Sequence, residues 1–196
     1  IVLDLMMPRM DGWSFLKRLR ADPRYEELPV VVTSAVTGVR PPGADACLQK
    51  PFDATAQKTI TSIPGVREAQ PLLTNSARVA GTTVQLYGLS ERPMYTPDLV
   101  AGNWYSDAQA RSHARVAVIG RALADKAQVA VGESIRVKAA AGPVSLRVVG
   151  INRNAAGPGM VLLPLGTLQS ALRSPGEINN YWISTTSRDH ATIDRI

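Results

Sequence analysis

The chain opens with Ile1-Val2-Leu3-Asp4-Leu5, an apolar run interrupted by one carboxylate. A short run of this kind is typical of a strand that is buried on both faces of a parallel sheet. A loop containing Gly12 follows, and apolar residues then recur at helical spacing before Pro23: Trp13, Leu16, Leu19. Because proline cannot continue a helix, this stretch predicts a strand, a loop and a helix that ends near Pro23.

Two further strands are predicted downstream. Residues 30–33 are rich in β-branched side chains, and residues 46–49 form a short run that is closed by Lys50-Pro51-Phe52-Asp53. A polar link containing proline and glycine, residues 38–43, separates the two. The order of strand, helix, strand, link and strand predicts a parallel α/β sheet with right-handed crossovers.

Three motifs in this segment follow one another in a fixed order. Asp4 ends a strand and precedes Met7-Pro8-Arg9-Met10-Asp11-Gly12, Ser34 ends the next strand, and Lys50-Pro51-Phe52-Asp53 follows the third. Together they resemble the receiver domain of response regulators, and the resemblance covers residues 1–57. It implies the C-terminal half of a doubly wound parallel sheet, in the order strand, helix, strand, strand.

The resemblance implies roles for three of these residues. Asp4 would be the phosphoacceptor, because a carboxylate at the carboxyl end of a parallel strand faces the crevice where such sheets bind ligands. Lys50 would pair with Asp4 or with the phosphoryl oxygens, and the Ser34 hydroxyl would contact the phosphoryl group. The implied partner is a histidine kinase of a two-component phosphorelay, and the implied location is the cytoplasm.

The segment also departs from the receiver pattern. Receivers bind Mg²⁺ through a pair of acidic residues on their first strand, which has no counterpart here, and a hard cation needs several oxygen ligands. Asp4 alone therefore predicts an incomplete and weak Mg²⁺ site, and otherwise no cofactor is expected. The segment between Ser34 and Lys50 is short, and Cys47 stands where receivers have an aromatic residue. We expect little phosphorylation of Asp4.

The pattern changes near residue 57. Pro64-Gly65 interrupts what would be the last receiver helix, so the join between two segments is expected between residues 54 and 60. From there the sequence is rich in strands and turns. Strands are predicted at 83–88, 115–119, 134–137, 144–149, 160–163 and 181–185, and helices at 122–126, at 165–172 and from 189 onward.

Glycine and apolar motifs after the join resemble the periplasmic core domain of MacB/FtsX-type ABC permeases, over residues 58–196. The motifs occur in the order expected of that family: Ile63-Pro64-Gly65-Val66, Val84-Gln85-Leu86-Tyr87-Gly88-Leu89, Leu99-Val100-Ala101-Gly102-Asn103-Trp104, Val116-Ala117-Val118-Ile119-Gly120, Val131-Gly132-Glu133-Ser134-Ile135, Arg147-Val148-Val149-Gly150-Ile151 and Val161-Leu162-Leu163-Pro164-Leu165. The resemblance implies a mixed α/β lobe with an inserted β-rich lobe.

The permease resemblance also implies a function without catalysis. The domain would lie outside the inner membrane, move with an ATPase on another chain, and contact adaptor, outer-membrane or lipoprotein partners. Trp104 and Tyr105 follow the turn at Gly102 and are candidates for an exposed partner surface, because aromatic residues are favoured at binding hot spots. The alternative is that both rings are buried in the core.

The amino-acid composition argues against several other classes of function. Residues 1–57 hold seven basic and seven acidic residues, while residues 58–196 hold fifteen and nine and thus the whole net charge of +6. The basic residues are scattered and aromatics are few, which argues against nucleic-acid binding. One cysteine excludes an intramolecular disulfide. No apolar stretch is long enough for a membrane span, and no signal peptide is recognisable.

Two interpretations remain open. In the first, a permease domain outside the membrane (58–196) carries a passive receiver remnant (1–57). In the second, the chain is a phosphorelay response regulator with Asp4 as phosphoacceptor. The two segments imply different compartments, so we expect a chimeric fragment. Both ends fall inside regular patterns and are expected to be cut from a longer sequence.

Overall fold

A computed structural model describes residues 1–6, 11–36, 38, 41–50, 52, 55–90, 93–94, 97–139, 142–153 and 159–185. The chain divides into two compact units. The N-terminal unit comprises Ile1–Ala69 and Ile183–Ile196, and the ring unit comprises Gln70–Trp182. The helix expected from residue 189 onward lies outside the described residues.

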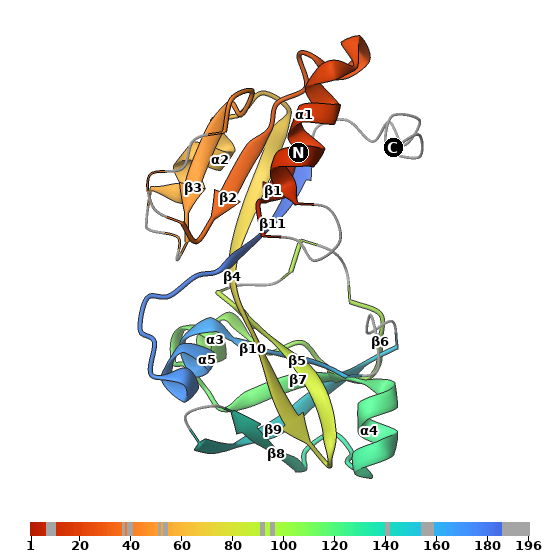
Figure 1. The fold of residues 1–196 in the computed structure, drawn as a ribbon. Coiled ribbons are helices and arrows are strands. Elements are labelled where there is room, and N and C mark those ends of the chain that lie inside the picture. Colours follow the sequence, from red (N-terminus) through yellow and green to blue (C-terminus); the bar gives the residue numbers. More distant parts are fainter. Residues whose placement is uncertain are drawn as a thin grey trace. The chain divides into compact units, whose positions relative to one another are not determined.

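The N-terminal unit contains a three-stranded parallel sheet in the order β1-β2-β3, which Figure 1 shows side by side. Val2 lies opposite Val31, and Val31 lies opposite Ala46. The elements are β1 (Val2–Asp4), α1 (Gly12–Ala21), the short 3₁₀ helix η1 (Pro23–Tyr25), β2 (Val31–Ser34), β3 (Ala46–Gln49) and α2 (Ala56–Thr61). The strands and the first helix agree with the sequence prediction, and no helix occupies the described residues between β2 and β3.

Helix α1 begins and ends where local chemistry requires. The Asp11 carboxylate accepts a hydrogen bond from the Ser14 amide at 2.8 Å and so caps the first turn. Asp22 ends the helix immediately before Pro23. Leu16 and Leu19 are buried on one face of α1, where they pack against the sheet residues Leu3, Leu5, Val30 and Val32.

The expectation that β1 is buried on both faces is wrong. Leu3 and Leu5 are buried with α1, but the Val2 side chain is 45 % exposed. Successive side chains of a strand point to opposite faces, so Val2 lies on the face away from α1. β1 is also the edge strand of the three, which leaves this face less covered.

The ring unit is built on one mixed sheet whose strand order closes on itself. Along the sheet the order is β11-β4-β5-β10-β7-β9-β6, and β8 pairs with both β9 and β4 (Figure 1). Strands β4, β5, β10, β7, β9 and β8 therefore form a ring, closed by the pair Arg78 and Lys138. The strands are β4 (Val66–Val79), β5 (Thr82–Leu89), β6 (Leu99–Gly102), β7 (Val116–Gly120), β8 (Ser134–Ala139), β9 (Gly142–Asn152), β10 (Met160–Pro164) and β11 (Asn180–Thr185).

Apolar side chains fill the ring from every strand. The six strands contribute buried residues to one cluster, among them Ala77, Leu86, Ile119, Val137, Val148 and Leu163. Helices α4 (Arg121–Ala127) and α5 (Leu165–Leu172) add Leu123 and Leu168 to this cluster. A second cluster lies on the outer face beside α3 (Asp107–Arg111) and includes Tyr105, Val118 and Leu162. The interior is thus a packed core.

The mixed α/β class is confirmed, and most of the predicted strands are present. All strands from β4 onward belong to one sheet, so the described residues show no separate β-rich lobe. From β4 onward three elements were not predicted, namely β4, β6 and α3, and neither was α2 before them. Helix α3 begins at a capping box, in which the Ser106 hydroxyl and the Gln109 side chain exchange bonds with each other's backbone amides.

One side chain fastens the start of β11 to β4. The Asn179 carboxamide accepts a hydrogen bond from the Thr74 amide at 2.8 Å and donates one to the Thr74 carbonyl at 2.8 Å. We expect Asn179→Leu to lower the free energy of unfolding by about 1–3 kcal/mol, because both Thr74 groups then lose their partner. Urea unfolding measures this. Asn179→Asp keeps the acceptor and should fall between, and a leucine variant as stable as the parent would contradict the bond's importance.

Candidate functional site

The N-terminal unit brings three predicted site residues to one end of its sheet. Asp4 ends β1, Ser34 ends β2, and Lys50 directly follows β3. Parallel strands of matched register end at the same edge, which is why residues far apart in sequence meet there. The Lys50 ammonium forms an ion pair with the Asp4 carboxylate at 2.5 Å.

Asp4 is held as a carboxylate. Partial burial raises its pKa, but the hydrogen bonds from Lys50 and from the Met6 amide and the charge of Lys50 outweigh this, so the pKa lies below its usual value. The Met6 amide donates to the second carboxylate oxygen at 3.0 Å. Each carboxylate oxygen therefore has a donor, and the side chain is still 38 % exposed.

Gly12 sets the shape of the loop behind Asp4. A Cβ atom at this position would lie 2.5 Å from the Asp4 carbonyl oxygen and 2.8 Å from the Leu5 Cα. The Gly12 amide donates to the Leu5 carbonyl at 3.1 Å. The start of α1 thus packs directly on the backbone that presents Asp4. Gly12 belongs to the motif that follows Asp4, but no role at the site was predicted for it.

Ser34 lies at the predicted edge of the sheet, but its hydroxyl is bonded to the backbone of Val36. The side chain is 1 % exposed, and its oxygen accepts a hydrogen bond from the Val36 amide at 2.9 Å. The Ser34 carbonyl accepts from the Lys50 amide at 2.7 Å, which ties the ends of β2 and β3 together. The structure therefore joins Asp4 to Lys50 directly, while the Ser34 hydroxyl is part of a local turn.

The described residues around Asp4 offer few ligands for a divalent cation. Among the described residues, no cluster of three or more His, Cys, Asp or Glu side chains could hold a metal ion. The neighbouring Asp11 uses its carboxylate to cap α1, through the amide and the hydroxyl of Ser14. One carboxylate already paired with Lys50 supplies too few oxygen ligands for Mg²⁺.

The expectation of an exposed aromatic pair in the ring unit is wrong for Tyr105. Its side chain is 1 % exposed and packs with Leu72, Val118 and Leu162 beneath α3. Trp104 is half-buried, and its ring centroid lies 4.6 Å from that of Tyr105. The physical reason is that Tyr105 directly precedes the N-cap of α3, so it points toward the sheet that α3 covers.

No helix of the described residues is long and apolar enough to cross a membrane.

Comparison with known proteins identifies relatives of the ring unit. The family model of the MacB-like periplasmic core domain matches residues 25–196. The fold resembles the extracellular domain of the noncanonic ABC-type transporter YknZ from Gram-positive bacteria, with a TM-score of 0.55 and 17 % sequence identity over 72 % of this chain and 77 % of that chain. At this identity the likeness concerns the fold.

Two curated response regulators match as well. Response regulator Rre1 of Synechocystis sp. is 48 % identical over 59 residues, which are 27 % of this chain and 26 % of Rre1. Response regulator PleD of Caulobacter vibrioides is 30 % identical over 112 residues, which are 50 % of this chain and 25 % of PleD. The chain spans about a quarter of the length of these relatives. Both resemblances seen in the sequence are confirmed, the response-regulator one over a short segment.

Proposed function

The chain belongs to the family of MacB-like periplasmic core domains, and we propose that it acts as a non-catalytic, extracytoplasmic domain of an ABC-type permease. In this role it binds partners and transmits movement between them and the transporter. The observation that carries the proposal is the closed ring of strands, with the family match extending over all of it.

The packed interior of the ring favours a function that is carried out at its outer surface. The interior is filled by buried side chains from all six strands and from α4 and α5. A close-packed core of this kind moves as one body, so force applied at one strand is passed to the others. The proposed partners are the ATPase of the transporter and, outside the membrane, adaptor, outer-membrane or lipoprotein components.

A second candidate function rests on the Asp4–Lys50 pair. In a phosphorelay, an Asp4 oxygen attacks the phosphorus of a kinase phosphohistidine, the P–N bond breaks, and the imidazole leaves. The observation that favours it is the position of both side chains at the carboxyl ends of parallel strands. We rank it second, because the described residues place no further carboxylates beside Asp4 that would bind Mg²⁺. Under the first candidate function, the permease domain, the N-terminal unit is a passive remnant of a receiver.

Phosphodonor labelling separates the two candidates. We expect the chain to take up little phosphate from acetyl phosphate and Mg²⁺, because the described residues place too few metal ligands beside Asp4. Intact-mass spectrometry measures the stoichiometry. Asp4→Asn serves as the control. Near-complete labelling of the parent that disappears in this variant would favour the phosphorelay.

Photo-crosslinking in cells tests the permease role. A photoreactive amino acid at Gln85, an exposed position on β5 of the ring, reports what lies beside the domain. We expect crosslinks to envelope proteins, and a photoreactive residue at the buried Leu86 should give none because no partner reaches it. Crosslinks to cytosolic proteins alone would overturn the proposal.

A further inference from the structure

Four basic side chains lie next to one another on the outer face of the ring. Arg78 on β4 is directly opposite Lys138 on β8, and Arg136 lies two residues from Lys138 on the same face. Arg147 on β9 is diagonal to Arg136, because Arg136 is opposite Ser145 and Arg147 is opposite Ser134. All four side chains are exposed. We call these four residues the basic row.

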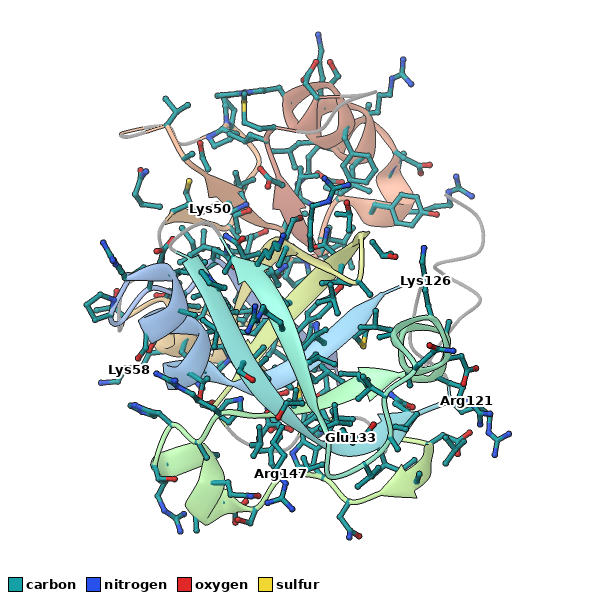
Figure 2. The ribbon with its side chains drawn as sticks, turned by 90° about the horizontal axis from the view of Figure 1, so that it is seen from below. Lys50, Lys58, Arg121, Lys126, Glu133 and Arg147 are labelled. Carbon is teal, nitrogen blue, oxygen red and sulfur yellow. The ribbon has the colours of Figure 1, made fainter. Side chains whose placement is uncertain are left out.

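The basic row has no counter-charge among the described residues. No carboxylate there forms an ion pair with any of the four. Two other arginines of the ring unit are paired: Arg121 with Asp125 at 2.8 Å, and Arg153 with Asp98 at 3.0 Å. The nearby Glu133 accepts a hydrogen bond from the Ala130 amide at 2.8 Å, which orients its carboxylate within its own turn. Figure 2 shows Glu133 and Arg147 at the same end of the sheet.

The position of the row has an energetic consequence. Arg78 and Lys138 are the pair through which β8 meets β4, so two like charges face each other where the ring closes. Like charges directly opposite on neighbouring strands repel and destabilise the pairing. An anion bound between them removes this repulsion. The bound state should therefore have a more stable closure than the free state.

We propose that the basic row binds an acidic, extended segment of a partner protein. Cross-strand neighbours are about 5 Å apart, and same-face neighbours along a strand or on a diagonal are about 7–8 Å apart. In an extended peptide, every second side chain is on one face at a repeat of about 7 Å. The steps from Lys138 to Arg136 and from Arg136 to Arg147 match this repeat, and the arginine forks can bind the alternate carboxylates bidentately.

The chemistry of the face favours a polypeptide over other polyanions. The side chains between the cations are hydroxyls, Ser134 and Ser145, which can donate to carboxylates or to a peptide backbone. Membrane-surface binding adds apolar insertion to charge, but the large apolar residue most exposed in the described ring unit, Val131, lies outside the row. Single-stranded nucleic acid stacks on aromatic rings, and none belongs to the row.

A peptide titration tests the inference. A fluorescent peptide of alternating glutamate and serine is titrated with the full chain, and anisotropy gives the dissociation constant. We expect Arg136→Gln/Arg147→Gln to weaken binding about tenfold, and added salt to weaken binding to the parent, because exposed charge pairs are screened. Lys126→Glu, on α4 and apart from Arg147 in Figure 2, is the control that lowers the net charge by the same two units, and it should change nothing.

Four further outcomes test the proposal. Peptide binding should raise the melting temperature of the parent, and Lys138→Gln should raise that of the free chain because the repulsion at the closure is gone. Equal loss of affinity in the Lys126 variant would show that only net charge matters and would overturn the proposal. Binding to anionic vesicles with none to the peptide would also overturn it. The titration needs no transporter, so it can fail independently of the crosslinking test of the permease role.

Discussion

Replacing Gly102 by alanine is expected to lower the free energy of unfolding of the ring unit by about 3–5 kcal/mol. Gly102 ends β6 with φ of +70°, a conformation that costs an L-residue about 1–2 kcal/mol. A Cβ atom there would lie 2.2 Å from the Val149 carbonyl oxygen and 3.0 Å from the Gly150 Cα. These obstacles are backbone atoms, so no side-chain rotation relieves the clash.

A second glycine separates strain from clash. Gly132 has φ of +97°, but its Cβ would meet no atom within 4 Å. Gly132→Ala should therefore cost only the conformational part, about 1–2 kcal/mol. Urea unfolding gives both values, and hydrogen exchange of β6 and β9 locates the damage. Equal effects of the two substitutions would show that the close approach at Gly102 contributes nothing.

This close approach shows what the sequence can and cannot predict. Gly102 and Gly150 belong to two of the quoted motifs, and no close approach was predicted for either. The register of β6 against β9 places Gly102 opposite Gly150, and a Cβ on Gly150 would lie 2.6 Å from the Asn103 carbonyl oxygen. A glycine indicates that another part of the backbone can pack closely against it. Which part this is depends on the strand pairing, and a single sequence does not reveal that pairing.

The omission of β4 has a different cause. Pro71 interrupts its sequence, and proline usually argues against a long strand. Yet β4 and β5 form a hairpin around Ala80-Gly81, where both residues have positive φ, at 47° and 77°. This is the conformation of a two-residue hairpin turn, and glycine in it is a recognisable signal. The alternation of Ala77, Val79, Val84 and Leu86 on the two sides of Ala80-Gly81 would have identified the pair.

The candidate site was predictable to the level of residues but not of contacts. Strand ends and motif order placed Asp4, Ser34 and Lys50 at one edge, and the structure brings Asp4 and Lys50 together. The direction of the Ser34 hydroxyl depends on the turn at Val36, which has no sequence signal of its own. Tyr105 was misjudged because an aromatic residue after a turn suggests exposure, while the covering helix α3 was not predicted.

Arg20 is expected to be the residue on which the N-terminal unit depends most after its apolar core. Its guanidinium donates to the carbonyl oxygens of Gly43 at 2.8 Å and Leu28 at 2.8 Å. It also donates to those of Tyr25 and Glu26 and pairs with Asp45 at 3.0 Å. Asp45 in turn accepts from the Val30 amide at 2.7 Å. One side chain on α1 thus fastens the segments that flank β2 and precede β3.

Arg20→Met should lower the free energy of unfolding of this unit by about 3 kcal/mol, because several carbonyl groups and one carboxylate lose their donor together. The apolar stem is kept, so the loss reports the guanidinium. Hydrogen exchange of residues 12–34 measures it, and exchange in the ring unit should not change. The control is Arg24→Met, whose ion pair with Asp22 is on the surface with 65 % of the arginine side chain exposed, and which should leave exchange as in the parent. Equal exchange in the Arg20 and Arg24 variants would mean that water replaces the arginine at no cost, and that the apolar cluster around Leu16 alone holds α1 to the sheet.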